Sequence, residues 1–494
     1  MLAVNLLLQF FCRKVFLMRL GTEVLGLNTT ATNLLQFLNI AELGIGVAVG
    51  FALYKPLFDN DHQRIKEIIA LQGHLYRRIA MIVIAGATLL GCFFPLIFSK
   101  MKLPLWYAYA SFGVLLLSSL LSYFVNYREV LLTADQKEYK IAFSYRLCMM
   151  TRLIIQLVAV YYFDHPYIWW LAIEGGFAII AAIALNSTIR RTYPYLGPVE
   201  ITGRELRRKY PEIVSKIKQI FFHKISTFVL QQTSPLIIYA FTTLTLVAYY
   251  GNYMIIVTGI MLLLNALFNS IGAGIGNLVA EGDKIKILNV FNELFAVRFF
   301  ISSGAALMLF FLAQPFISIW IGNEYLLPRT SLFIITLTLF LNTSRSSVDS
   351  YINAYGLFQD VWAPIAEAVI NLGLSILFGW LWGLDGILSG VVASLILIVF
   401  IWKPYFLFRW GMKEPVSVYL KIYVQNMAAL GMTVAVIWWI FPHIPCNNPA
   451  NSGQFVALAA EIFTIAAISL FIFQSMFCRG MRMFSRRIIG KIRK

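Results

Sequence analysis

Charged side chains inside long apolar runs are the residues of this sequence that could do chemistry. A charge in hydrocarbon costs about 2.5–3.5 kcal/mol even on a lenient insertion scale, so such residues usually face a cavity or an opposite charge. Cations slightly outnumber acids in this set, which predicts an aqueous cavity whose unpaired cations bind an anionic ligand. The set consists of Arg13, Lys14, Arg146, Arg152, Lys224, Arg298 and Arg345 together with Glu42, Glu174, Glu293, Asp349, Glu367 and Glu461.

The cations differ in their depth within the apolar runs. Arg152 lies about 11 residues into its run, near the middle of a bilayer, where a long side chain reaches water least easily. Lys224 lies near a helix end, so the simpler alternative is that its amine reaches the membrane surface. The predicted substrate-binding residues are Arg13, Lys14, Arg146, Arg152, Lys224 and Arg298.

Three intramembrane acids are candidates for coupling transport to an ion gradient. Glu174 precedes a pair of glycines, and Glu367 is followed one helical turn later by Asn371. For both acids the alternative is a hydrogen bond between helices. Asp349 is spaced i, i+4 from Arg345, so these two residues are expected to pair on one helix.

Two similar segments in the two halves of the chain end in glycine pairs, Gly44/Gly46 and Gly272/Gly274. The segments lie about 222 to 228 residues apart, and internal repeats of this size are typical of transporters. Neither pair follows a strand, which excludes a dinucleotide fold. The pairs are predicted hinges for motion of the bundles, with close helix packing by small residues as the alternative.

Motifs of catalysis and of metal binding are absent from the sequence. There is no H-E-x-x-H, no G-x-S-x-G and no paired cysteine motif, and the five cysteines are scattered along the chain. The chain is therefore predicted not to be an enzyme and to need no metal or cofactor.

The elements that carry these residues are predicted membrane helices. Hydrophobic residues make up 60% of the 494 residues and charged residues only 13%, about half the charged fraction of a soluble protein. Apolar runs of about 20 residues or more predict an all-α polytopic membrane protein with about fourteen transmembrane helices. The predicted spans are 1–20, 25–54, 79–99, 104–126, 141–163, 167–187, 219–242, 245–279, 292–322, 330–355, 361–382, 384–402, 417–441 and 455–478.

Positive charge sets the predicted orientation of these helices. With a cytoplasmic N-terminus, 28 Lys and Arg residues, Lys403 among them, fall on the cytoplasmic side and four on the opposite side. This bias is the one expected for a membrane protein with both ends inside. The net charge of +17 is thus explained without a nucleic acid partner.

Two six-helix bundles followed by two extra helices are the predicted organisation. Residues 1–190 form an N-lobe, 191–218 a basic cytoplasmic linker, 219–410 a C-lobe, and 411–478 the last two helices, expected outside the core. Residues 479–494 carry seven cations among apolar residues, which predicts an amphipathic helix on the anionic cytoplasmic leaflet.

Several short motifs in this order resemble a known family. They are Arg19–Leu27 (RLGTEVLGL), Leu38–Gly46 (LNIAELGIG), Tyr250–Tyr253 (YGNY), Pro364–Leu372 (PIAEAVINL) and Gly383–Gly390 (GLDGILSG). The sequence resembles the Wzx-type polysaccharide flippases of the multidrug/oligosaccharidyl-lipid/polysaccharide exporter superfamily over nearly its whole length. Such proteins often carry an Asp in the seventh helix, where this chain has Gln231 to Pro235.

The resemblance implies a protein of the bacterial inner membrane that flips a polyprenyl-pyrophosphate-linked oligosaccharide, for lipopolysaccharide O-antigen or a related polysaccharide. Membrane lipids and a coupling ion, H⁺ or Na⁺, are the other implied partners, and Arg or Lys would bind the pyrophosphate. A multidrug antiporter of the same superfamily is the alternative, although it favours an acidic cavity. A membrane polymerase or ligase of saccharide assembly is a further alternative, but it would be expected to have a large outer loop.

Overall fold

The computed structural model describes residues 2–42, 44–269, 272–357, 359–360, 362–444, 447 and 449–492. Within these ranges it leaves undescribed the side chains of residues 2–7, 41, 219, 222–232, 266, 269, 272–273, 280 and 489–492. The described residues form helices, turns and bends, with no strand among them, which confirms the predicted all-α class. The chain divides into two compact units, Met1–Ala248 and Tyr249–Lys494.

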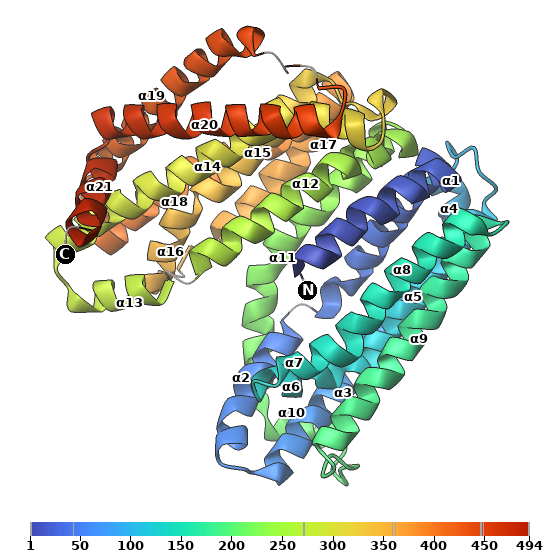
Figure 1. Cartoon of the computed structure of the whole chain (residues 1–494). Coiled ribbons are helices and arrows are strands. Elements are labelled where there is room, and N and C mark those ends of the chain that lie inside the picture. The colour runs from blue at the N-terminus through green and yellow to red at the C-terminus, as the bar shows by residue number, and fades with distance from the viewer. Residues whose placement is uncertain are drawn as a thin grey trace. The chain divides into compact units, whose positions relative to one another are not determined.

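The first unit consists of long helices and several short ones, joined by turns and loops (Figure 1). Asp61 begins one of the long helices, because its side chain accepts a hydrogen bond from the backbone N–H of Arg64. Its helices are α1 (Leu2–Leu38), α2 (Ile45–Phe58), α3 (His62–Cys92), α4 (Phe94–Ile97), α5 (Trp106–Phe124), α6 (Glu129–Ala134), α7 (Glu138–Ile141), α8 (Leu147–Tyr162), α9 (Pro166–Thr192), α10 (Gly203–Lys209) and α11 (Pro211–Phe241), with short turns of helix at Asn39–Glu42, Asn126–Arg128 and Ala142–Arg146.

Glycine divides α1 at the place where two predicted spans meet. Gly21 has φ 82° and ψ 172°, a backbone conformation that interrupts the helix and favours glycine. A few residues later, a Cβ atom at Gly26 would lie 2.0 Å from the carbonyl oxygen of Leu244. Helix α1 therefore packs against the start of α12 at a distance that only a glycine permits.

The core of the first unit fixes the short helix α10. Leu206 and Tyr210 are buried in one hydrophobic cluster with Ile65 and Ile68 of α3 and Leu185 of α9. Full burial of one such aliphatic side chain contributes about 1.5–3 kcal/mol to folding. The basic segment that the sequence marks as a linker is therefore folded onto α3.

The second unit contains the remaining helices, and α12 runs from the first unit into it. Gly383, with φ 58°, interrupts α17 at the boundary predicted between spans 361–382 and 384–402. Its helices are α12 (Leu244–Asn269), α13 (Gly272–Glu281), α14 (Lys284–Trp320), α15 (Arg329–Ser344), α16 (Ser346–Ala354), α17 (Trp362–Ser394), α18 (Lys403–Phe406), α19 (Val416–Ile440), α20 (Ser452–Phe477) and α21 (Arg479–Ile492), with shorter helical segments at Asn323–Tyr325, Leu395–Trp402, Leu407–Met412 and Phe441–His443.

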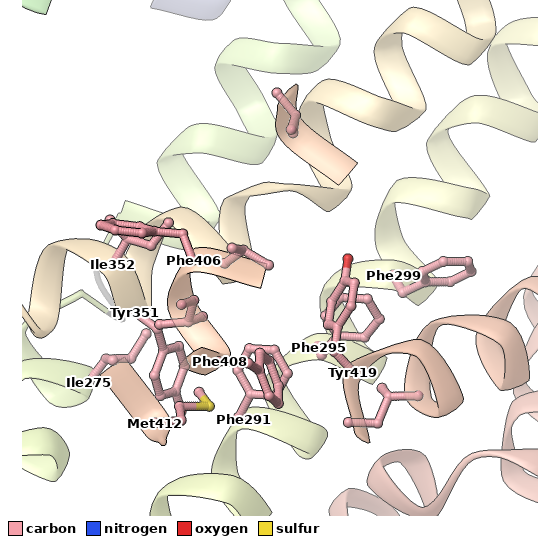
Figure 2. Close-up of a cluster of buried hydrophobic side chains, with 14 of the residues drawn as sticks. Ile275, Phe291, Phe295, Phe299, Tyr351, Ile352, Phe406, Phe408, Met412 and Tyr419 are labelled. Atoms are coloured by element: carbon pink, nitrogen blue, oxygen red, sulfur yellow. The ribbon is translucent and has the colours of Figure 1, made fainter. Parts of the chain in front are cut away.

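An aromatic cluster holds this unit together around α14 (Figure 2). Phe291 is fully buried and its ring lies 5.1 Å from that of Tyr351 and 5.4 Å from that of Phe408. Phe295 and Phe299 continue the same face of α14. These edge-on ring contacts fix α14 against α16 and against the segment at Leu407–Met412. They thereby position the charged residues of α14 and α16, Arg298 and Asp349.

Nine of the described helical ranges are long and apolar enough to cross a membrane, the pattern of a multi-pass membrane protein. Trp362–Met412 covers two predicted spans, and helices also occupy the predicted spans 1–20, 25–54, 219–242 and 330–355. The total of fourteen crossings stays a prediction. The nine ranges are His62–Cys92, Trp106–Phe124, Glu138–Tyr162, Pro166–Thr192, Leu244–Asn265, Lys284–Trp320, Trp362–Met412, Val416–His443 and Ser452–Phe477.

The division between the units lies at residues 248 and 249, whereas the sequence places the start of the C-lobe at residue 219. Helix α11, which follows the basic linker, groups with the first unit because it packs on α1 and α2. The predicted organisation stays a proposal. It consists of the lobes 1–190 and 219–410, the linker 191–218 and the two helices of 411–478.

Candidate functional site

Four charged side chains of the second unit form one network. The Nε of Arg345 donates to Asp349 Oδ2 at 2.9 Å, and the Nζ of Lys403 donates to Asp349 Oδ1 at 3.0 Å. The Nη1 of Arg345 lies 3.6 Å from Glu367 Oε1. The network contains two cations and two acids, so its formal charges balance. The predicted i, i+4 pair of Arg345 and Asp349 is confirmed.

Local chain geometry brings these residues together. Arg345 lies at the junction between α15 and α16, and Asp349 is one turn further along. Glu367 lies in the second turn of α17, and Lys403 begins α18 after the helical segment Leu395–Trp402. Glu367 is only 3% exposed, and its Oε1 has no hydrogen-bond partner within the described part of the chain. Its carboxylate is thus the least firmly held member of the network.

Arg298 of α14 is buried next to this network without an acidic partner. It is 2% exposed, and its Nη1 donates to the hydroxyls of Ser350 at 3.0 Å and Ser346 at 3.4 Å. Its guanidinium carbon lies 5.0 Å from the centre of the Phe268 ring. Nε has no partner among the described residues, and no described carboxylate lies within ion-pair distance. This cation retains unused donors.

The first unit holds a second buried pair. Arg152 of α8 forms an ion pair with Glu174 of α9, and Gln156 donates to the other carboxylate oxygen of Glu174 at 2.9 Å. Both charged side chains are less than a fifth exposed. The structure therefore joins a predicted substrate-binding cation to a predicted ion-coupling acid. Their spacing of 22 residues on two helices gives no local signal for this contact.

The other predicted substrate-binding residues lie in different surroundings. Arg13 is half-buried and donates to the carbonyl oxygen of Ala248 at 3.1 Å, and Lys14 beside it is half-buried. Arg146 is exposed and pairs with Glu138 at 2.5 Å. The side chain of Lys224 lies outside the described residues.

One of the four predicted hinge glycines has a backbone that requires glycine. Gly44 has φ 95° at the start of α2, and a Cβ there would lie 2.9 Å from the side chain of Ile220. Gly46 and Gly274 lie within helices and have no such strain. Gly272 begins α13, and its surroundings lie outside the described side chains. Hinge motion at these glycines stays a prediction.

Two features of the site escape the sequence analysis. The charge distribution predicts Lys403 at the cytoplasmic surface, but in the structure its side chain is 16% exposed and bound to Asp349. A polar face of α1 lines a cavity of about 340 Å³. The spacing of polar residues within one apolar span is the signal that could have revealed it. This face consists of Asn28, Thr29, Thr32, Asn33 and Gln36.

The arrangement suits ion binding better than covalent chemistry. Within the described ranges, no group of three His, Cys, Asp or Glu residues could hold a metal ion. Buried guanidinium groups with free donors bind oxyanions through paired hydrogen bonds. A buried carboxylate with a loose partner, such as Glu367, can gain or lose a proton or a cation.

Comparison with known proteins shows similarity at the level of the fold. No protein-family model and no curated protein matches this sequence. A structure of the lipid II flippase MurJ in an inward closed conformation is 16% identical, covers 98% of both chains and has a TM-score of 0.63. An inward-facing multidrug resistance MATE family transporter of the MOP superfamily is 14% identical and covers 83% of this chain and 95% of its own, with a TM-score of 0.57. This chain shares its fold with both of these membrane transport proteins.

Proposed function

We propose that this chain is a transporter that flips a polyprenyl-pyrophosphate-linked oligosaccharide across the bacterial inner membrane by alternating access. A proton or sodium gradient would drive the movement, and both chain termini would lie in the cytoplasm. The chain would act without a cofactor and not as an enzyme. Its substrate would carry two linked phosphates, so the binding site needs desolvated cations with free donors.

Arg298 is the observation that carries this proposal. It is 2% exposed and, among the described residues, donates only to neutral hydroxyls of α16, while the acid beside those hydroxyls is already bound by Arg345 and Lys403. An uncompensated buried charge costs several kcal/mol. In a transporter, a bound anionic substrate would compensate this charge. Such a function would explain why a destabilising buried cation is present.

The extent of the structural similarity favours a flippase over a multidrug antiporter. The lipid II flippase matches 98% of this chain, so it has counterparts for nearly all of it. The multidrug transporter matches 83%, which leaves 17% of this chain without a counterpart. An antiporter for cationic drugs would also be expected to present free acids. Glu174 and Asp349 are both paired with cations, which leaves the loosely held Glu367 and Glu461 for such a role.

A reconstituted flipping assay tests the proposal. The full chain is placed in liposomes with a fluorescent polyprenyl-pyrophosphate oligosaccharide, and an impermeant reagent measures how much of it reaches the opposite leaflet. We expect flipping that a proton or sodium gradient accelerates. Efflux of a cationic dye from the same liposomes serves as the comparison.

Two results would contradict the proposal. Dye efflux without movement of the lipid-linked saccharide would favour the multidrug antiporter. Elongation or transfer of the saccharide would favour the polymerase or ligase.

A further inference from the structure

A basic cavity lies in the first unit, on the side that the charge distribution predicts to be cytoplasmic. Its volume is about 630 Å³, and its lining contains five cations and no acid. They come from α3 and from the two consecutive helices α10 and α11, which lie more than 100 residues further along the chain. The cations are Arg78 of α3, Arg204, Arg207 and Arg208 of α10, and Lys218 of α11.

The acids near this cavity are already bound elsewhere. Glu67 accepts from Lys209 at 2.7 Å and from the hydroxyl of Tyr210 at 2.6 Å. Glu205 closes a capping box at the start of α10: the backbone N–H of Thr202 donates to its carboxylate at 3.0 Å and holds the pKa of Glu205 below its usual range. No described ion pair involves any of the five cations, although the charge of Glu205 acts on Arg208.

The cavity is built into the fold and is more than a flexible basic loop. Leu206 is 1% exposed and inserts into the core of the first unit. A Cβ atom at Gly203 would lie 2.2 Å from the ring of His74, so the start of α10 packs directly on α3. With one face of α10 fixed in this way, the arginines of its other faces are directed into the cavity.

The lining of the cavity and its expected position at the membrane surface indicate its ligand. Four of the five cations are arginines, whose planar donor groups suit phosphate oxygens. Pro211 and Val214 add an apolar part to the lining, and Lys218 directly precedes the predicted span 219–242. On this predicted topology, the cavity is expected at the level where lipid phosphates meet water. A free phosphate would have no use for the apolar part of the lining.

We propose that this cavity is a binding site for the phosphate headgroup of an anionic lipid in the cytoplasmic leaflet. The bound lipid balances the charge of α10 and holds the segment between α9 and α11 at the membrane surface. This assignment does not depend on which substrate the chain transports.

The test measures thermal unfolding of the full chain in nanodiscs. Nanodiscs of phosphatidylcholine alone are compared with nanodiscs that also contain phosphatidylglycerol, and bound lipid is counted by native mass spectrometry. We expect phosphatidylglycerol to raise the unfolding temperature and to be retained by the protein. Inorganic phosphate and pyrophosphate, added to the phosphatidylcholine nanodiscs, are expected to have little effect.

A matched pair of triple variants separates the cavity from general surface charge. Arg204→Gln with Arg207→Gln and Arg208→Gln removes three cations of the cavity. Lys55→Gln with Arg190→Gln and Arg191→Gln removes three exposed cations of the same unit, and each triple lowers the net charge from +17 to +14. We expect the first triple to weaken lipid retention about tenfold or more, since each cation contributes about 1 kcal/mol at an anionic surface. The second triple should retain the lipid.

Arg→Lys substitution at the same three positions of α10 controls for folding, because it keeps the charge. We expect an intermediate loss of retention, since the paired donors of arginine are missing. Equal loss in both Gln triples would overturn the proposal in favour of nonspecific surface charge. Stabilisation by free phosphate but not by phosphatidylglycerol would overturn the assignment to a lipid.

Discussion

Arg298 and Asp349 lie on two contacting helices, α14 and α16, yet they do not pair. Arg298 donates to Ser350, the residue that follows Asp349, while Asp349 is bound on both oxygens by Arg345 and Lys403. Both carboxylate oxygens of Asp349 are therefore already bound by cations. This relationship leaves the buried Arg298 without an acidic partner among the described residues and forms the basis of the first prediction.

Arg298→Ala should reduce saccharide flipping about tenfold or more, because hydrogen bonds to charged groups contribute about 1.5–3 kcal/mol each. Arg298→Lys should restore flipping only in part, since the ammonium lacks the planar pair of donors. Arg409→Ala, which changes an exposed arginine of the same unit, is the control and should flip normally. Normal flipping by Arg298→Ala in the liposome assay would remove this residue from the substrate site.

The charge network should respond differently to the loss of its two acids. Asp349→Asn leaves two cations without their shared partner. Because Asp349 is 28% exposed, the loss should lie between the about 0–1 kcal/mol of an exposed pair and the about 3–5 kcal/mol of a buried one. Glu367→Gln should cost clearly less, because Glu367 lies 3.6 Å from Arg345 and forms no hydrogen bond with it. Thermal unfolding in detergent measures both effects.

The double variant Asp349→Asn with Lys403→Gln tests whether charge balance is the cause. Its two changes cancel in charge, so its loss of stability should be smaller than the sum of the losses in Asp349→Asn and Lys403→Gln, and a double-mutant cycle measures this difference as the coupling free energy. Additive losses would show that Lys403 and Asp349 stabilise the unit independently of each other.

The sequence predicts contacts well where they are local. The i, i+4 spacing of Arg345 and Asp349 places both side chains on one helical face, and the structure pairs them. Gly21 and Gly383 interrupt helices between apolar runs that are each long enough to span a membrane, so these boundaries could also be predicted.

Contacts between distant helices could not be predicted, because periodicity does not specify which helices pack together. Lys403 lies 54 residues from Asp349, and the distribution of Lys and Arg along the sequence predicts it at the cytoplasmic surface of the membrane. The pairing of Arg152 with Glu174 likewise depends on how α8 packs against α9. The polar face of α1 was missed for a different reason. Its amides and hydroxyls carry no charge, so a search for intramembrane charges passes over them.

The pair of Arg152 and Glu174 allows a test of ion coupling. Glu174→Gln should leave flipping largely independent of the ion gradient, because the carboxylate that we propose to exchange the ion is lost. Reversal of the pair, Arg152→Glu with Glu174→Arg, should restore thermal stability relative to Arg152→Glu alone while flipping stays low. Liposomes with and without an imposed gradient measure the first effect. A gradient dependence that survives in Glu174→Gln would assign this acid a structural role.

The C-terminal helix α21 has both a docked face and a charged face. Gly480 packs so closely on α14 that a Cβ atom would lie 2.0 Å from the carbonyl oxygen of Asn292, and Met481 beside it is 3% exposed. Arg487 reaches Glu293 of α14 at 3.1 Å. The predicted helix of the tail is confirmed, and its contact with the lipid surface stays a prediction.

Gly480→Val should displace α21 from α14, because the added side chain meets backbone rather than a side chain that can move aside. We expect the tail to become sensitive to limited proteolysis in detergent while flipping continues, since the tail carries none of the proposed substrate-binding residues. Arg487→Gln should have a smaller effect, because its side chain is more than half exposed and exposed ion pairs contribute about 0–1 kcal/mol. Deletion of residues 479–494 should reduce the amount of inserted protein without abolishing flipping by the protein that is inserted. Complete loss of flipping in a correctly inserted Gly480→Val variant would instead give the contact between α21 and α14 a direct part in transport.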